Sequence, residues 1–97
     1  MAKEVIWTPR ALNDFDKVIG FLEEKWTEKE ITKFIESTNK VINYISQNPE
    51  LFRRTNKSNV YEALVTPHNL LIYRVYPKKI YLVTFWDTRR NPKKKRF

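Results

Sequence analysis

The chain has 97 residues, which at roughly 100–200 residues per domain suffices for one domain with a single core. It has no cysteine, one histidine and one glycine, so disulfides, Cys-ligated metal sites and glycine-rich phosphate loops are excluded, and we expect no metal and no cofactor. The net charge is +8, but a 41% hydrophobic content with 6 Phe, 5 Tyr and 3 Trp excludes a disordered polyelectrolyte.

The positive charge is concentrated in the second half of the chain. Residues 1–51 hold 7 Lys or Arg and 9 Asp or Glu, whereas residues 52–97 hold 12 and 2. This asymmetry indicates a basic face or tail for an anionic partner, such as nucleic acid, an acidic protein segment or a membrane surface. No run of about 18 apolar residues and no secretion signal is found, so we expect a cytoplasmic protein without a membrane partner.

The first quarter of the chain predicts a short strand and a helix. Residues 4–7 form the strand, and Thr8-Pro9 is a helix start in which the threonine caps a free N–H. Apolar residues then recur in steps of three and four, at Leu12, Phe15, Ile19, Leu22 and Trp26. Gly20 lies inside this helix, and we expect close packing to be its reason.

A second helix follows after two or three residues. Thr27 and Glu30 have the spacing of a capping box, and apolar residues continue at helical spacing from Ile31 to Ile45. Asn48-Pro49 ends the run, because the residue before proline avoids the helical region. The short connection predicts an antiparallel helix hairpin.

The second half of the chain predicts a basic loop and a sheet. The loop covers residues 53–59, and three runs rich in β-branched and aromatic residues follow at 60–65, 70–76 and 80–86. The order β-α-α-β-β-β predicts an α+β fold, with a mainly antiparallel sheet and an antiparallel helix hairpin packed on one face.

Neither of the last two strands has a clean polar face. Strict alternation places Tyr81, Val83 and Phe85 on one side of the last strand, and Leu82 and Trp86 on the other. The second sheet face is therefore expected to be aromatic and uncovered, and to contact another molecule. The alternative is a small sheet with two central strands whose ends curl over that face.

Several segments occur in order along the chain: Val5-Ile6-Trp7-Thr8 with Ala11 and Asp14, then residues 48–51, 71–75 and 80–85, and finally 87–92. Together they resemble the RelE/ParE superfamily, the toxins of bacterial type II toxin–antitoxin modules, and most closely its ParE-like, plasmid-stabilisation branch. The resemblance implies one toxin domain over residues 1–92 with a basic C-terminal tail at 93–97. It also implies a growth inhibitor that an antitoxin, with an acidic segment, holds inactive.

The resemblance leaves the cellular target open. The ParE branch is associated with inhibition of DNA gyrase, whereas the RelE branch cleaves ribosome-bound mRNA without a metal. A plain nucleic-acid-binding module is a third hypothesis, so whether the chain is an enzyme is undecided. A homo-oligomer and a hetero-oligomer with the antitoxin are both compatible with the resemblance.

Candidate residues follow from this resemblance and from the charge pattern. RelE-type nucleases work mainly with Lys and Arg, so the catalytic candidates are Arg53, Lys57, His68, Arg74, Arg89 and Arg90. The expected target or antitoxin contacts are Arg74, Tyr76, Trp86, Arg89, Arg90, Lys93, Lys94, Lys95 and Arg96.

Simpler structural roles are open for several of these residues. His68 is alternatively a turn residue, Arg74 an open-face arginine lying over Tyr76, and Arg89 the start of a solvated tail. Asp87 is expected to be a turn or salt-bridge residue. The chain also lacks two features of RelE-branch nucleases, an arginine within residues 67–70 and a tyrosine near the C-terminus.

Overall fold

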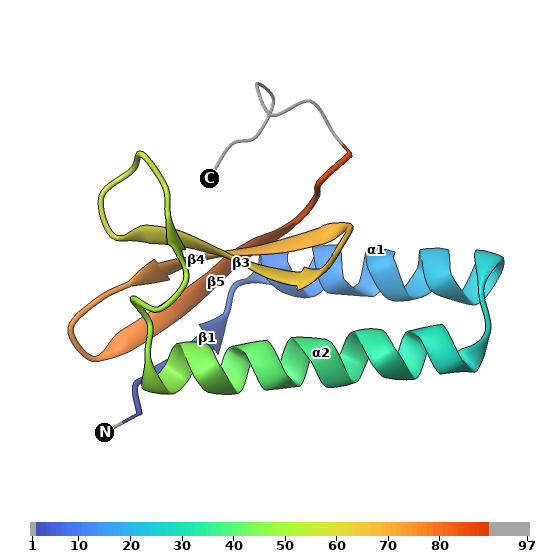
Figure 1. Ribbon diagram of the computed structural model, residues 1–97, viewed down its shortest axis with the longest axis horizontal. Coiled ribbons are helices and arrows are strands. Elements are labelled where there is room, and N and C mark those ends of the chain that lie inside the picture. The colour runs from blue at the N-terminus through green and yellow to red at the C-terminus, as the bar shows by residue number, and fades with distance from the viewer. Residues whose placement is uncertain (1, 90–97) are drawn as a thin grey trace.

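A computed structural model describes residues 2–89 and shows two helices against one sheet (Figure 1). In chain order the elements are β1 (Glu4–Trp7), α1 (Pro9–Lys25), α2 (Glu28–Gln47), β2 (Arg53–Arg54), β3 (Val60–Thr66), β4 (Asn69–Val75) and β5 (Lys79–Asp87). The strand order is β1-β5-β4-β3-β2; β1 runs parallel to β5, and the other pairs are antiparallel. The expected α+β fold is confirmed.

Both helix starts form as their sequences predict. Thr8 Oγ1 accepts a hydrogen bond from the Ala11 N–H at 3.2 Å, and Pro9 occupies the first turn. At the second start, the amide of Thr27 donates to the Glu30 carboxylate at 3.1 Å, and the Thr27 hydroxyl donates to the same carboxylate. That hydroxyl is the main cause of the lowered pKa of Glu30. Only Trp26 and Thr27 separate the helices, which form the expected hairpin.

The main core lies between the helix hairpin and one sheet face. An aromatic cluster occupies its centre, where Phe15 stacks on Phe34 at 5.2 Å and meets Trp7 edge-on at 5.3 Å. Phe85 reaches the same cluster from β5, with ring centroids 5.8 Å from Trp7. Such aromatic contacts add to the apolar burial that holds the layers together.

A β-bulge in β5 corrects the predicted alternation. Tyr73 pairs with Leu82 and Ile72 pairs with Thr84, so Val83 is an extra residue in the ladder. Leu82 and Phe85 therefore both reach the main core, although strict alternation placed them on opposite faces. Trp86 and Val83 belong to a second cluster instead.

The second sheet face is not an open aromatic surface as expected. Val60, Ile72 and Trp86 are buried there as a second apolar cluster, with Leu70 and Val83 packed against it. Diagonal neighbours on one face of an antiparallel sheet lie within reach of an aromatic side chain, so these residues help to bury one another. The expectation of an uncovered face is wrong at these positions, including the proposed contact residue Trp86.

Two further expectations are corrected. Residues 53–59 were expected to be a loop, but Arg53 and Arg54 pair with β3 as a fifth strand that is too short to show an alternating pattern. Close packing does not explain Gly20, because it is exposed and a Cβ there would meet no atom within 4 Å.

Replacing Gly20 by alanine should stabilise the protein. Alanine restricts the unfolded chain and suits a helix interior, so Gly20→Ala is expected to raise the free energy of unfolding by about 0.5–1 kcal/mol. Urea denaturation followed by circular dichroism measures this change. A lower stability than wild type would show that Gly20 is needed by the folded chain itself.

Tyr73 links the sheet to the end of α2. Its ring is buried and stacks on Tyr61 at 5.7 Å, and its hydroxyl donates to the Pro49 carbonyl at 2.7 Å. Burial is the main cause that raises the Tyr73 pKa above its usual range. The neutral phenol is therefore favoured in the folded state, and this contribution to stability is lost as pH rises above about 10, the pKa of an unfolded tyrosine.

Tyr73→Phe should cost about 1 kcal/mol at pH 7, because it removes one buried hydrogen bond. It should also make the loss of stability between pH 9 and roughly 11 shallower than in wild type. Urea denaturation across this range tests both effects, with the exposed Tyr44→Phe as the matched control. Equal slopes for the two variants would contradict this role of Tyr73.

Candidate functional site

The structure divides the predicted site residues between two regions. His68 lies in the turn between β3 and β4, close to Arg89, which follows β5. Arg53 and Arg74 lie on the sheet face opposite the helices, since their neighbours in β3 and β4 face the main core. Arg90 and the tail residues Lys93, Lys94, Lys95 and Arg96 lie outside the described residues.

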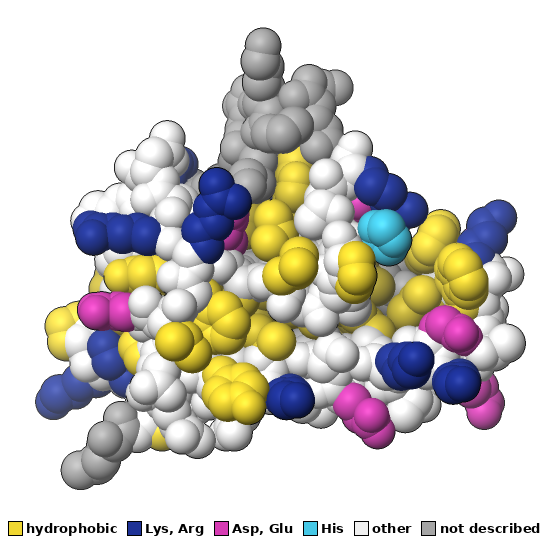
Figure 2. Space-filling model, viewed as in Figure 1, with side chains coloured by type: hydrophobic (Ala, Val, Ile, Leu, Met, Phe, Trp, Pro, Cys, Tyr) yellow, Lys and Arg dark blue, Asp and Glu magenta, His cyan; other side chains and the backbone are white. Residues whose placement is uncertain are grey.

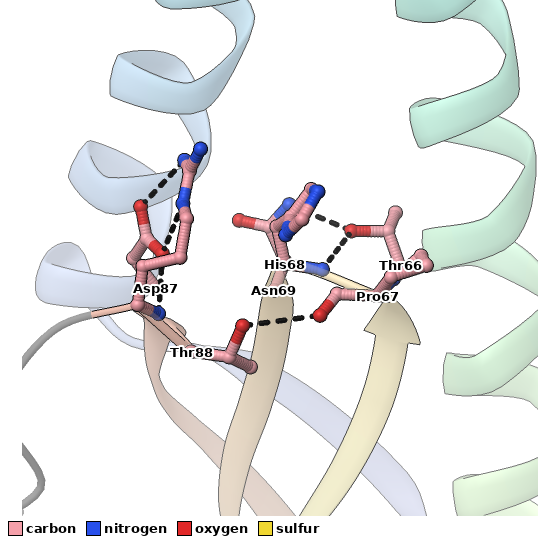
Figure 3. A network of polar contacts seen from close by, with 7 residues as sticks. Thr66, Pro67, His68, Asn69, Asp87 and Thr88 are labelled. Carbon is pink, nitrogen blue, oxygen red and sulfur yellow. Dashed lines mark hydrogen bonds and ion pairs between the residues drawn. The ribbon is translucent and has the colours of Figure 1, made fainter.

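Hydrogen bonds attach the β3–β4 turn to the end of β5 (Figure 3). The hydroxyl oxygen of Thr66 accepts from the His68 amide at 3.2 Å and from the Asn69 side chain at 2.8 Å. The Thr88 amide donates to the His68 carbonyl, and its hydroxyl to the Pro67 carbonyl, both at 3.0 Å. These bonds fix the backbone of the turn and leave the His68 side chain exposed.

Arg89 is held by Asp87 in a bidentate ion pair. Its Nε and Nη2 atoms lie 3.0 and 2.9 Å from the two carboxylate oxygens, and its amide donates to the same carboxylate at 2.8 Å. The hydrogen bonds that Arg89 donates to the Asp87 carboxylate are the main cause that raises the pKa of Arg89. The prediction that Asp87 is a salt-bridge residue is confirmed.

His68 and Arg89 line a groove of about 720 Å³ that no sequence pattern predicted. Its walls come from α1, the start of α2, the β3–β4 turn and the end of β5. Apolar side chains of α1 line it, among them Val18 and Leu22, and Phe21 is 45% exposed and Trp26 57%. In Figure 2 hydrophobic side chains gather beside the histidine, between basic ones. An apolar concavity of this size is typical of a binding site.

Each carboxylate that lines the groove accepts at least one hydrogen bond, and the groove also has two lysines. Glu30 bonds to the α2 N-cap, Asp87 to Arg89, and Asp14 accepts from the Thr84 hydroxyl. Lys17 of α1 and Lys33 of α2 make no ion pair within residues 2–89. Four basic and three acidic side chains line the groove, so its net charge is slightly positive.

The second region includes a residue that sequence reasoning missed. Glu62 of β3 is only 8% exposed, and its carboxylate lies 3.6 Å from Arg53 Nε. Arg74 pairs with Tyr81 of β5, whose ring meets Tyr76 edge-on at 5.5 Å. Tyr76 is 39% exposed. The signal for Glu62 was present, because it is the single acidic residue between 51 and 86 and interrupts an apolar strand.

Lys57 does not line the groove and belongs to no strand. It lies in the loop between β2 and β3, where its amide donates to Thr55 Oγ1 at 3.1 Å, and its side chain is exposed. Among residues 2–89, no cluster of three His, Asp or Glu side chains could hold a metal ion. No described helix is long and apolar enough to cross a membrane.

Comparison with models of protein families assigns most of the chain to one known family. Residues 5–92 match the model of the ParE toxin of the type II toxin–antitoxin system parDE. The chain therefore belongs to the ParE toxin family, and its function is that of a type II toxin–antitoxin toxin. A comparison with curated protein sequences gives no match.

Solved structures show the same fold at low sequence identity. A chain of the chromosomal ParDE system from P. aeruginosa superposes with a TM-score of 0.75 at 16% identity, covering 89% of this chain and 96% of that one. The YoeB dimer from Staphylococcus aureus gives 0.64 at 14%, covering 93% and 100%. The E. coli DinJ–YafQ complex gives 0.59 at 9%, covering 90% and 93%.

Proposed function

We propose that this toxin, with a domain over residues 1–92 and a basic tail at 93–97, inhibits growth in the cytoplasm by binding a protein target, DNA gyrase. The observation that carries this proposal is the separation of the candidate catalytic groups. His68 and Arg89 line the groove, whereas Arg53 and Arg74 lie on the opposite sheet face. RNA cleavage needs its acid, base and cation within reach of one phosphate, and these four residues do not converge.

We further propose that the antitoxin docks in the groove. An antitoxin partner agrees with the family, and related folds were solved as toxin–antitoxin complexes, among them YoeB–YefM and DinJ–YafQ. The exposed rings of Phe21 and Trp26 suit the apolar side of a docked segment. Lys17 of α1 and Lys33 of α2 also line the groove and suit acidic side chains of the docked segment.

Charge reversal at the two groove lysines tests this docking site. Lys17→Glu with Lys33→Glu should weaken the complex with the antitoxin encoded by the neighbouring gene by about 10-fold or more, chiefly at low salt. Lys29→Glu with Lys40→Glu, two exposed helix lysines outside the groove, is the matched control. Equal affinities of the two double variants, measured by calorimetry, would place the antitoxin elsewhere.

A RelE-like, ribosome-dependent endoribonuclease is the second candidate, and Glu62 is the observation that favours it. Glu62 is only 8% exposed and lies beside the Arg53 guanidinium, on the same sheet face as Arg74. In a nuclease its carboxylate would be the general base, and the arginines would bind the phosphate. Glu62→Gln keeps the shape of the side chain and removes the base.

The two candidates differ in what the toxin does in cells. Expressed without its antitoxin, a gyrase-binding toxin should produce gyrase–DNA cleavage complexes with intact mRNA, and Glu62→Gln should stay toxic. A nuclease should produce new mRNA ends, and Glu62→Gln should lower the cleavage rate by roughly 10²–10⁴-fold. Mapping mRNA ends and gyrase complexes in the same cells distinguishes them. New mRNA ends without gyrase complexes would overturn the gyrase proposal.

A further inference from the structure

The wall of the groove contains a carboxylate with one oxygen still available. Asp14 of α1 lines the groove, and its side chain is 20% exposed. Thr84 Oγ1 donates to Asp14 Oδ2, and Arg10 Nε lies 4.0 Å from the same oxygen. Oδ1 accepts no hydrogen bond from residues 2–89, although an ionised carboxylate has about four acceptor positions.

Thr84 fixes where this carboxylate lies. Thr84 is only 1% exposed, and its hydroxyl also contacts the Phe85 carbonyl at 3.3 Å, so the donor is anchored in β5. Arg10 is half-exposed, and its 4.0 Å contact is at the limit of an ion pair, so it compensates the charge weakly. Asp14 therefore presents a weakly compensated negative charge from a fixed position, in a groove lined by four basic and three acidic side chains.

A segment that fills the groove excludes water from Asp14. A carboxylate that loses its water without a new donor is strongly destabilised, and an acidic side chain against it adds repulsion. A lysine or arginine of the segment at this position supplies both a donor and the opposite charge. A groove of this kind would select a segment by the charge of one side chain, in addition to the apolar and acidic side chains that the rest of the groove suits.

We propose that Asp14 is a specificity determinant of the groove, with Thr84 as its positioning residue, and that it selects an antitoxin segment carrying one basic side chain at the contact. The inference rests on the proposed docking of the antitoxin in the groove. It adds a requirement that does not follow from Lys17 and Lys33, namely one basic side chain within an otherwise acidic and apolar antitoxin segment.

Calorimetric titration with the full-length antitoxin of the neighbouring gene tests the proposal. Asp14→Asn should weaken binding by about 10–100-fold, because the isosteric amide removes the charge. Thr84→Val, which removes only the hydroxyl, should weaken it by a smaller factor. Asp16→Asn, on the same helix but outside the groove, is the control and should bind within about 2-fold of wild type. Thermal denaturation of each free variant confirms that it is folded.

Charge exchange identifies the partner residue. Each lysine and arginine of the antitoxin is changed to glutamate in turn and titrated against wild type and Asp14→Lys. One of these changes should weaken binding to wild type and restore binding to Asp14→Lys by about 10-fold or more. Uniform effects across all antitoxin positions would overturn the proposal, because no single side chain would then contact Asp14.

The outcomes also distinguish this inference from the docking proposal. Asp14→Asn binding like wild type, while Lys17→Glu with Lys33→Glu weakens binding, overturns the role of Asp14 and leaves the groove as the docking site. If neither Asp14→Asn nor the double lysine variant changes the affinity, the antitoxin does not occupy the groove, and both proposals fail.

Discussion

The start of helix α1 is attached to the sheet by the hydrogen bonds of one residue, Thr8. Its side-chain oxygen accepts from the Ala11 amide at 3.2 Å and donates to the Leu82 carbonyl at 2.6 Å, and its amide donates to the same carbonyl at 3.3 Å. One residue thus ends β1, caps α1 and attaches that cap to β5. Two residues further along β5, Thr84 pairs with Ile72 of β4 and its hydroxyl donates to Asp14 of α1. This attachment and the packing of Phe15 on Phe85 together hold the α1 wall of the groove against β5.

Local signals predicted both helices and the strands β1, β3, β4 and β5, because caps, periodicity and residue type act within a few residues, but they missed the short strand β2. Thr8, Thr27 and Asn48-Pro49 mark helix ends that the structure confirms. The bulge at Val83 could not be predicted in this way, because it depends on pairing with β4 and leaves no signature in the strand itself. This single extra residue places Phe85 with Leu82 in the main core and Trp86 with Val83 in the second cluster, whereas strict alternation separated the members of each pair.

The candidate site was predictable only where its residues are close in sequence. Asp87 and Arg89 are two positions apart, and their ion pair follows from that spacing. The groove combines segments that are more than 50 residues apart in the chain, so no local pattern contains it. Gly20, by contrast, is conspicuous in the sequence, but no neighbouring atom in the folded chain requires a glycine there. Glu62 was visible as a lone acid, but its importance depends on burial.

The two regions constrain how an antitoxin neutralises this toxin. The groove opens on the helix side of the sheet, whereas Arg53, Glu62 and Arg74 lie on the opposite face. A segment seated only in the groove therefore leaves the second face accessible. If the target binds at the groove, an antitoxin segment bound there competes with the target directly. If the target binds the second face, the antitoxin chain must continue around an edge of the sheet. The site of target binding thus determines how much of the toxin an antitoxin must cover.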